Sequence, residues 1–139
     1  MLSLNRPEKA HAYDRKHLLQ LKSCVEELSE IATVVVIRSV GHRAFCAGAD
    51  LNGMKHPDPL SALSLLSQTV FTALAQAPFV SIASIHGAAI AGGCELTLAC
   101  DLRVAGPQAR FELPETNLGL IPAAGGCTRL IQLIGLSRA

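Results

Sequence analysis

One acidic residue, Glu95, lies in the otherwise apolar segment from Ile90 to Cys100, shortly after Gly92 and Gly93. Burying an unpaired carboxylate is unfavourable by several kcal/mol unless the group is neutralised or partnered. A second carboxylate, Glu115, follows twenty residues later. Two carboxyl groups that meet in a dry pocket can move protons on and off carbon or water. The pair is therefore a candidate for acid–base chemistry.

Two further segments can supply backbone N–H groups to the same chemistry. Small residues from Ala44 to Leu51 let the main chain approach a ligand closely and leave amides pointing outward. Gly92 and Gly93 open a predicted helix, whose first N–H groups are free and whose dipole favours negative charge. Two such amides from different loops can form an oxyanion hole, in which each donor is worth roughly a hundred- to a thousandfold in rate.

The residue pattern leaves less specific interpretations open. Glu95 could be a first-turn acid that only complements a helix dipole. Glu115 could be an exposed loop residue after Pro114. Asp50 could cap the turn that follows it.

The elements that must position these residues alternate between helices and short strands. Asp14 can cap a helix, and a second helix is expected from Pro59 to Pro78. The β-branched run 33–37 predicts a strand covered on both faces. Further strands are expected at 79–85 and 102–105, and further helices at 92–100 and over 130–134. This alternation predicts an α/β architecture with parallel strands.

Composition limits the remaining possibilities. A chain of 139 residues forms at most one domain, and 50% hydrophobic residues indicate a globular one. A net charge of +1 and 4% aromatic residues argue against nucleic acid as a partner. No apolar run is long enough to span a bilayer, so no membrane partner is expected. A small neutral or modestly anionic ligand fits the composition best.

The five cysteines are odd in number and form no CxxC motif. They are interpreted as small buried thiols in a reducing compartment. The cytoplasm is expected, with the mitochondrial matrix as the alternative for a eukaryotic protein. His42 and Cys46 could form a metal or nucleophilic pair, but no third ligand stands at a suitable spacing. No metal site is predicted.

Four segments in register resemble the enoyl-CoA hydratase/isomerase (crotonase) superfamily, and Asn5–Lys9 resembles the segment that follows its early strand. The segments are Phe45–Leu51, Ala91–Leu96 with Cys100 and Asp101, Pro114 and Glu115 with Gly119–Pro122, and Gly125 with Gly126. The resemblance implies a crotonase-like (ClpP/crotonase) spiral of ββα units. It also implies a substrate carried as a coenzyme A thioester.

The resemblance assigns roles to individual positions. Glu95 and Glu115 match the two catalytic glutamates of the hydratases, and the amides of Ala49 and Gly92 match the oxyanion hole. The implied substrate-binding residues are Ala10, Ala12, Ala49, Asp50, Leu51, Asn52 and Gly92.

Having both glutamates favours an enoyl-CoA hydratase, which adds water reversibly and syn to a 2-enoyl-CoA in fatty-acid or acyl-CoA catabolism. No cofactor is expected beyond the coenzyme A of the substrate. One alternative is a Δ3-Δ2-enoyl-CoA isomerase that uses mainly Glu115. Another is a truncated, non-catalytic protein that binds acyl-CoA or interacts with partners.

Family members are nearly twice as long as this chain. Residues 1–139 are therefore expected to form a partial crotonase-like domain, the N-terminal spiral core. The first strand and the C-terminal helical trimerisation region would be lacking, and the full-length protein is expected to be a homo-oligomer, a trimer or hexamer. The chain departs from the family pattern at several positions: Ala91 replaces a common glycine, Ala123 stands where glycine usually follows the proline, Cys127 and Thr128 stand where Thr-Gln is frequent, and His11 replaces a common asparagine.

Overall fold

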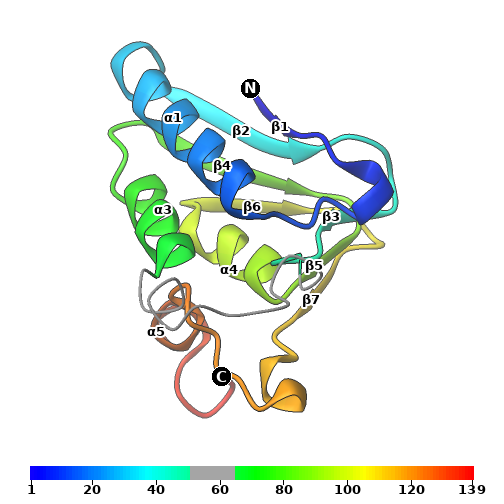
Figure 1. Ribbon diagram of the computed structural model, residues 1–139. Coiled ribbons are helices and arrows are strands. Elements are labelled where there is room, and N and C mark those ends of the chain that lie inside the picture. The colour runs from blue at the N-terminus through cyan, green and yellow to red at the C-terminus, as the bar shows by residue number, and fades with distance from the viewer. Residues whose placement is uncertain (51–64) are drawn as a thin grey trace.

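The computed structural model describes residues 1–50 and 65–139, which form two parallel sheets and the helices around them (Figure 1). The four-stranded sheet has the order β1-β2-β4-β6, and the three-stranded sheet has the order β3-β5-β7. All strand pairs in both sheets are parallel. The strands are β1 Leu2–Leu4, β2 Val34–Ser39, β3 Ala44–Cys46, β4 Val80–Ile85, β5 Ala88–Ile90, β6 Leu102–Ala105 and β7 Arg110–Glu112.

The chain repeats one unit three times along the described residues. Each unit adds one strand to the four-stranded sheet, then a short strand to the three-stranded sheet, and then a helix. The three helices are α3 Leu66–Ala75, α4 Gly92–Ala99 and α5 Gly126–Ile134. This repeat confirms the predicted spiral of ββα units and the parallel α/β architecture.

The first helix, α1, spans Arg15–Ile31 and begins as predicted. The Asp14 carboxylate accepts a hydrogen bond of 3.1 Å from the backbone N–H of His17, which satisfies one of the free donors of the first turn. In Figure 1, α1 and α3 lie in front of the same face of the four-stranded sheet. The first part of the predicted second helix, 59–64, lies outside the described residues.

The prediction that the strand at 33–37 is covered on both faces is wrong. Side chains along β2 alternate between the two faces, so that Val35 and Ile37 are buried whereas Val34 is 53% exposed. Val80, which pairs with Val34, and Val104 are also exposed. The core therefore fills one face of this sheet, and the opposite face carries exposed apolar side chains.

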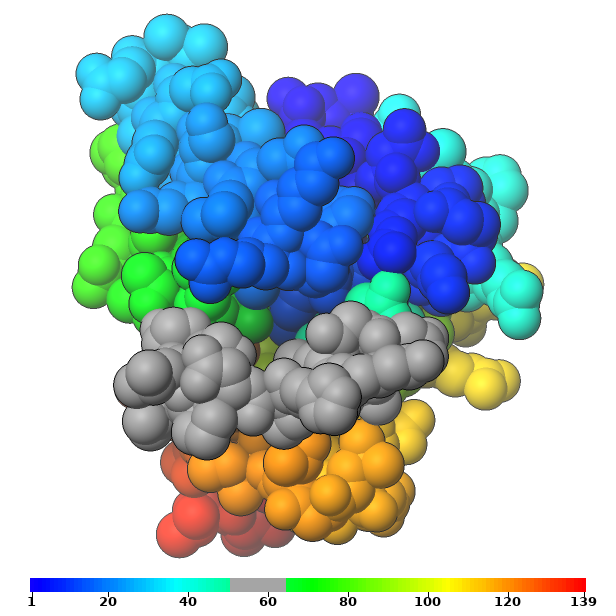
Figure 2. All heavy atoms as spheres, in the orientation of Figure 1, coloured from blue at the N-terminus to red at the C-terminus, as the bar shows by residue number. Residues whose placement is uncertain are grey.

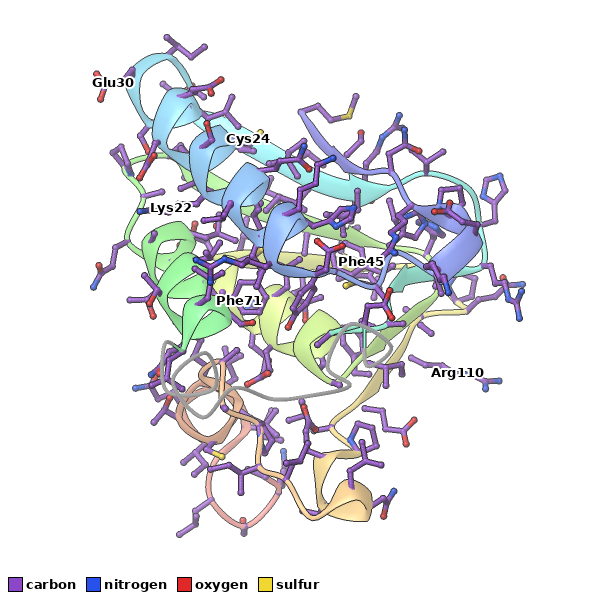
Figure 3. The ribbon with its side chains drawn as sticks, viewed as in Figure 1. Lys22, Cys24, Glu30, Phe45, Phe71 and Arg110 are labelled. Carbon is purple, nitrogen blue, oxygen red and sulfur yellow. The ribbon has the colours of Figure 1, made fainter. Side chains whose placement is uncertain are left out.

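The core lies between the helices and the two sheets. Figure 3 shows Phe45 of β3 and Phe71 of α3 inside the molecule, whereas Arg110 of β7 points away from it. Both phenylalanines are fully buried. In Figure 2 the residues after β7, orange to red, form the lower end of the molecule. Within residues 1–50 and 65–139, no helix has both the length and the apolar character needed to cross a bilayer.

Candidate active site

The candidate site lies where the three strands of the smaller sheet end. Because β3, β5 and β7 are parallel, their carboxyl ends meet at one edge of the sheet. β3 leads into Gly48 and Ala49, and β5 leads into Gly92 at the start of α4. β7 leads into Glu115, the first residue of the 3-10 helix η3 (Glu115–Leu118). Glu95 follows Gly92 within the first turn of α4, so the topology brings the segments that carry all four catalytic and oxyanion-hole positions implied by the resemblance to one edge.

Glycines let these segments approach each other closely. Gly48 has a φ of +86°, and a Cβ atom added there would lie 3.1 Å from the Gly92 nitrogen. A Cβ atom at Gly93 would overlap the carbonyl oxygen of Cys46. Only backbone without side chains allows the start of α4 to rest on the end of β3.

Ala91, which precedes α4, has φ 51° and ψ −127°. Such backbone conformations favour glycine and are strained for other residues by about 1–3 kcal/mol. The observation explains physically why a glycine would suit this position. Gly92 then opens α4, so its N–H belongs to the first turn, where helices leave donors unsatisfied.

Ala49 is held by a parallel bridge to Tyr13. The Tyr13 N–H donates to the carbonyl of Gly48, and the Asp50 N–H donates to the carbonyl of Tyr13, both at 2.8 Å. These two bonds use the amides of Tyr13 and Asp50 and not that of Ala49. Neither bond engages the N–H that the resemblance assigns to the oxyanion hole.

Glu95 is only 3% exposed, and its carboxylate accepts two backbone hydrogen bonds at a single oxygen. Ala124 N–H and Gly126 N–H both donate to Oε1 at 2.8 Å. Gly126 is the first residue of α5, so the carboxylate lies at the N-terminus of that helix. Burial raises the pKa of Glu95, and the two amides oppose that rise by stabilising the charged form.

Glu115 is also buried, with 8% of its surface exposed, so the interpretation as an exposed loop residue is wrong. Within the described residues, its Oε2 atom is buried without a hydrogen-bond partner. The negative charge of Glu115 further raises the pKa of Glu95. The two carboxyl groups therefore share one electrostatic environment, although 20 residues separate them.

Comparison with known proteins agrees with this geometry. The sequence profile of the family described as Enoyl-CoA hydratase/isomerase matches residues 1–139.

The chain belongs to the enoyl-CoA hydratase/isomerase family.

It is 40% identical to the 2,3-dehydroadipyl-CoA hydratase of Escherichia coli, over 100% of this chain and 55% of that protein. The crystal structure of an enoyl-CoA hydratase from Bacillus anthracis matches with a TM-score of 0.92 and 38% identity, covering 98% of this chain and 54% of that one. A Thermobifida fusca structure in complex with acetoacetyl-CoA matches with a TM-score of 0.87 and 31% identity, covering 98% and 58%. The chain spans about half the length of the curated relatives it matches.

Among the remaining positions implied by the family resemblance, Ala10 and Ala12 lie beside the segment that holds Ala49. The carbonyl of Ala10 accepts from the N–H of Ala47, and the carbonyl of Ala12 accepts from Arg6 Nη1. The same Nη1 forms an ion pair of 3.0 Å with Asp50. Arg6 thus ties the two loops together, a role that sequence reasoning missed because the contact spans 44 residues.

Two other positions implied by the resemblance, Leu51 and Asn52, lie outside the described residues. His11, another departure from the family pattern, has a φ of 58°, a left-handed conformation that histidine and asparagine both tolerate. Its Nε2 lies 2.9 Å from the carbonyl oxygen of Val40, and its Nδ1 accepts from the backbone N–H of Arg6. The substitution at this position therefore suits the backbone.

Sequence reasoning also missed Tyr13, the only tyrosine of the chain. Its ring packs edge-to-face on Phe71, with centroids 5.9 Å apart. A Cβ atom at Gly92 would overlap the Tyr13 hydroxyl. Burial raises the pKa of Tyr13, and the charges of Glu95 and Glu115 raise it further. Tyr13 therefore stays neutral and forms part of the wall behind Gly92.

The cysteine prediction is correct for Cys46, Cys94 and Cys100, which are buried, and wrong for Cys127, which is exposed on α5. All five cysteines are free thiols. The suggested pair of His42 and Cys46 is not formed, because Cys46 Sγ donates to the carbonyl of His11 and the His42 ring packs against another histidine. In the part of the chain that the structure describes, no three metal-ligating side chains gather.

A hollow of about 490 Å³ lies at the opposite edge of the small sheet. It is lined by residues at the amino ends of β3, β5 and β7, including Arg43 and Arg110. The glutamates lie at the carboxyl ends of these strands. This hollow is therefore separate from the candidate site.

Proposed function

We propose that this chain carries the catalytic core of an enoyl-CoA hydratase, which adds water reversibly and syn to a 2-enoyl-CoA thioester. One observation carries the proposal: two buried, electrostatically coupled glutamates lie at the strand ends that also present Ala49 and Gly92. The family supports acyl-CoA chemistry, and the relative solved with acetoacetyl-CoA supports a coenzyme A thioester as substrate.

In the proposed mechanism, the N–H groups of Ala49 and Gly92 polarise the thioester carbonyl and stabilise the enolate that forms when the hydroxyl adds. Backbone donors suit this task because they are fixed in place before the reaction begins. No redox cofactor is needed, since hydration transfers no electrons to or from an acceptor.

Glu95 and Glu115 share one water in this mechanism. The hydroxyl of the water adds at carbon 3, and a proton is delivered to carbon 2, so that one water is consumed per double bond. Glu95 uses Oε1 for the amides of Ala124 and Gly126, which leaves Oε2 to hold the water. Oε2 of Glu115, which has no hydrogen-bond partner among residues 1–50 and 65–139, supplies the second contact. Burial raises the pKa of Glu95 toward neutral pH. An acid–base group is most effective when its pKa lies near the working pH.

The proposal predicts that Glu95→Gln and Glu115→Gln each lower kcat for crotonyl-CoA hydration by about a hundred- to ten-thousandfold. The measurement is the loss of enoyl-thioester absorbance with the protein that carries this chain. Glu112→Gln, which removes an exposed carboxylate on β7, is the matched control and should keep the rate. A Glu95→Gln variant with full hydratase activity would contradict the assignment.

The second candidate is a Δ3-Δ2-enoyl-CoA isomerase, because the two amides at Glu95 could make that residue purely structural and leave Glu115 as the acid–base group. Parallel assays with 3-enoyl-CoA and 2-enoyl-CoA separate the two reactions. Turnover of the 3-enoyl thioester alone would favour the isomerase.

We also propose a homo-oligomer, a trimer or hexamer, as the working form of the full-length protein. Exposed apolar side chains after Glu115, among them Leu118, Leu120 and Ile121, support an association surface. The expected cytoplasmic compartment remains a prediction that rests on the free thiols.

A further inference from the structure

Arg129, on the first turn of α5, connects three parts of the molecule. Its Nη1 donates to the carbonyl of Ala124 at 2.8 Å, and its Nη2 donates to Thr72 Oγ1 on α3 at 3.2 Å. The planar guanidinium thus bridges the turn 124–126 and a helix 57 residues away in the sequence.

The turn 124–126 is the same segment that binds Glu95. Ala124 is held from both sides, since its N–H donates to Glu95 Oε1 and its carbonyl accepts from Arg129. Gly125, with a φ of +104°, makes this possible, because a Cβ atom there would overlap Arg129 Nη1. The residues around Glu95 therefore form a chain of contacts that runs from the carboxylate through the turn to Arg129 and α3.

We propose that Arg129 is a positioning residue for Glu95, which fixes the direction of its carboxylate by clamping the turn 124–126 against α3. Its effect on turnover rests on the proposed hydratase function, whereas its hold on the turn does not. Free movement of the turn would let Oε1 lose its amide donors, and a misplacement of about 1 Å in such a site can lower the rate about a hundredfold.

The charges around Glu95 make this role measurable. Arg129 faces it from α5 and lowers its pKa, whereas Glu115 faces it from η3 and raises it. Tyr13 and Cys94 also interact with the charge of Glu95, and burial raises the pKa of both above their usual values. Because both therefore remain neutral near pH 7, removing the guanidinium takes away a positive charge that lowers the pKa of Glu95, while the negative charge of Glu115 stays. The pKa of Glu95 should then rise.

The experiment is a carboxyl carbon-13 NMR titration of glutamate-labelled protein, with the Glu95 signal assigned by its loss in Glu95→Gln. Arg129→Met should raise the pKa of Glu95 and speed hydrogen exchange of the Ala124 and Gly126 amides at least tenfold. Hydration kcat should fall about a hundredfold with little change in KM. Arg138→Met, which removes one exposed positive charge outside the clamp, is the matched control and should resemble the wild type.

Arg129→Lys separates charge from geometry, because the ammonium keeps the charge but lacks the planar fork. We expect a titration of Glu95 close to the wild type together with faster exchange at Ala124 and Gly126. An Arg129→Met protein that titrates and exchanges like the wild type would overturn the proposal. If that variant does not fold, unchanged exchange in Arg129→Lys would overturn it equally. A wild-type protein without hydratase activity would reject the proposed function but leave the titration and exchange results valid.

Discussion

Glu95 holds a carboxylate where water is largely excluded, and backbone amides take the place of water around it. A buried carboxylate is tolerated when hydrogen bonds satisfy its charge. Ala124 and Gly126 provide two such bonds at the start of α5, where the helix dipole also favours negative charge. Glu95 does stand in the first turn of α4, as the alternative interpretation expected, but its carboxylate accepts from Ala124, in the turn before α5, and from Gly126, the first residue of α5.

The raised pKa of Glu95 predicts how stability depends on pH. Because burial makes the folded-state pKa higher than the unfolded value of about 4.3, the stability linked to the protonated carboxyl is fully present below that value. It is lost as the pH rises through the folded-state pKa. Glu95→Gln lacks this titrating carboxyl and does not lose that stability at high pH. Its Tm relative to the wild type should therefore be higher at pH 7.5 than at pH 4.

Thermal unfolding by circular dichroism at the two pH values measures this difference. Glu112→Gln, which changes an exposed carboxylate on β7, is the matched control variant. An equal change for Glu95→Gln, or a larger one at pH 4, would show that burial does not dominate the titration of Glu95.

At the scale of elements, the contact between α4 and β3 decides where the oxyanion-hole candidates lie. Gly93 brings the helix so close to β3 that a Cβ atom would overlap the carbonyl of Cys46. The contact is to backbone, which cannot move aside as a flexible side chain does. The placement of Gly92 next to Gly48 depends on this approach.

Gly93→Ala should therefore lower the free energy of unfolding by about 1–3 kcal/mol, because the overpacked backbone of β3 must shift. Gly106→Ala is the control, since a Cβ atom there would lie 3.7 Å from the Ile85 oxygen, an ordinary contact. Its effect should stay within about 0.5 kcal/mol. Urea unfolding measures both, and equal stabilities would contradict the close approach.

At the scale of the whole molecule, the spiral brings one part of the site from each successive turn. The first unit ends its short strand beside Ala49, the second beside Gly92 and Glu95, and the third beside Glu115. The first N–H of α5, that of Gly126, then donates to the Glu95 carboxylate. Since parallel strands stack in register, each turn advances the chain by one strand and returns it to the same edge.

The residues after Glu115 leave a set of apolar side chains exposed: Leu118, Leu120, Ile121, Ile131, Leu133, Ile134 and Leu136. Clusters of this kind mark association surfaces, whereas single exposed leucines such as Leu19 are common. Residues 1–139 should therefore associate in a concentration-dependent way in sedimentation experiments. The double variant Leu120→Ser, Ile121→Ser should reduce the association, and Leu19→Ser should not. A chain that stays monomeric at all concentrations would contradict this.

Features that depend on neighbours along the chain can be predicted from the residues alone. The Asp14 cap, the apolar face of α1, the presence of a helix at α5, the strands around 35 and 82, and the unusual placement of Glu95 could all be predicted, because capping and periodicity act over a few residues. The family motifs, being ordered strings of residues, also indicated both glutamates as candidates.

How these elements meet depends on long-range packing, which the residues alone do not predict. The three-residue strands β3, β5 and β7 are too short to show alternation, and the open face of β2 depends on where the helices pack. The amides that bind Glu95 come from 29 and 31 residues away, and the clamp by Arg129 spans 57. Such contacts follow from strand register and helix packing, because these bring together groups whose local sequences carry no signal of each other.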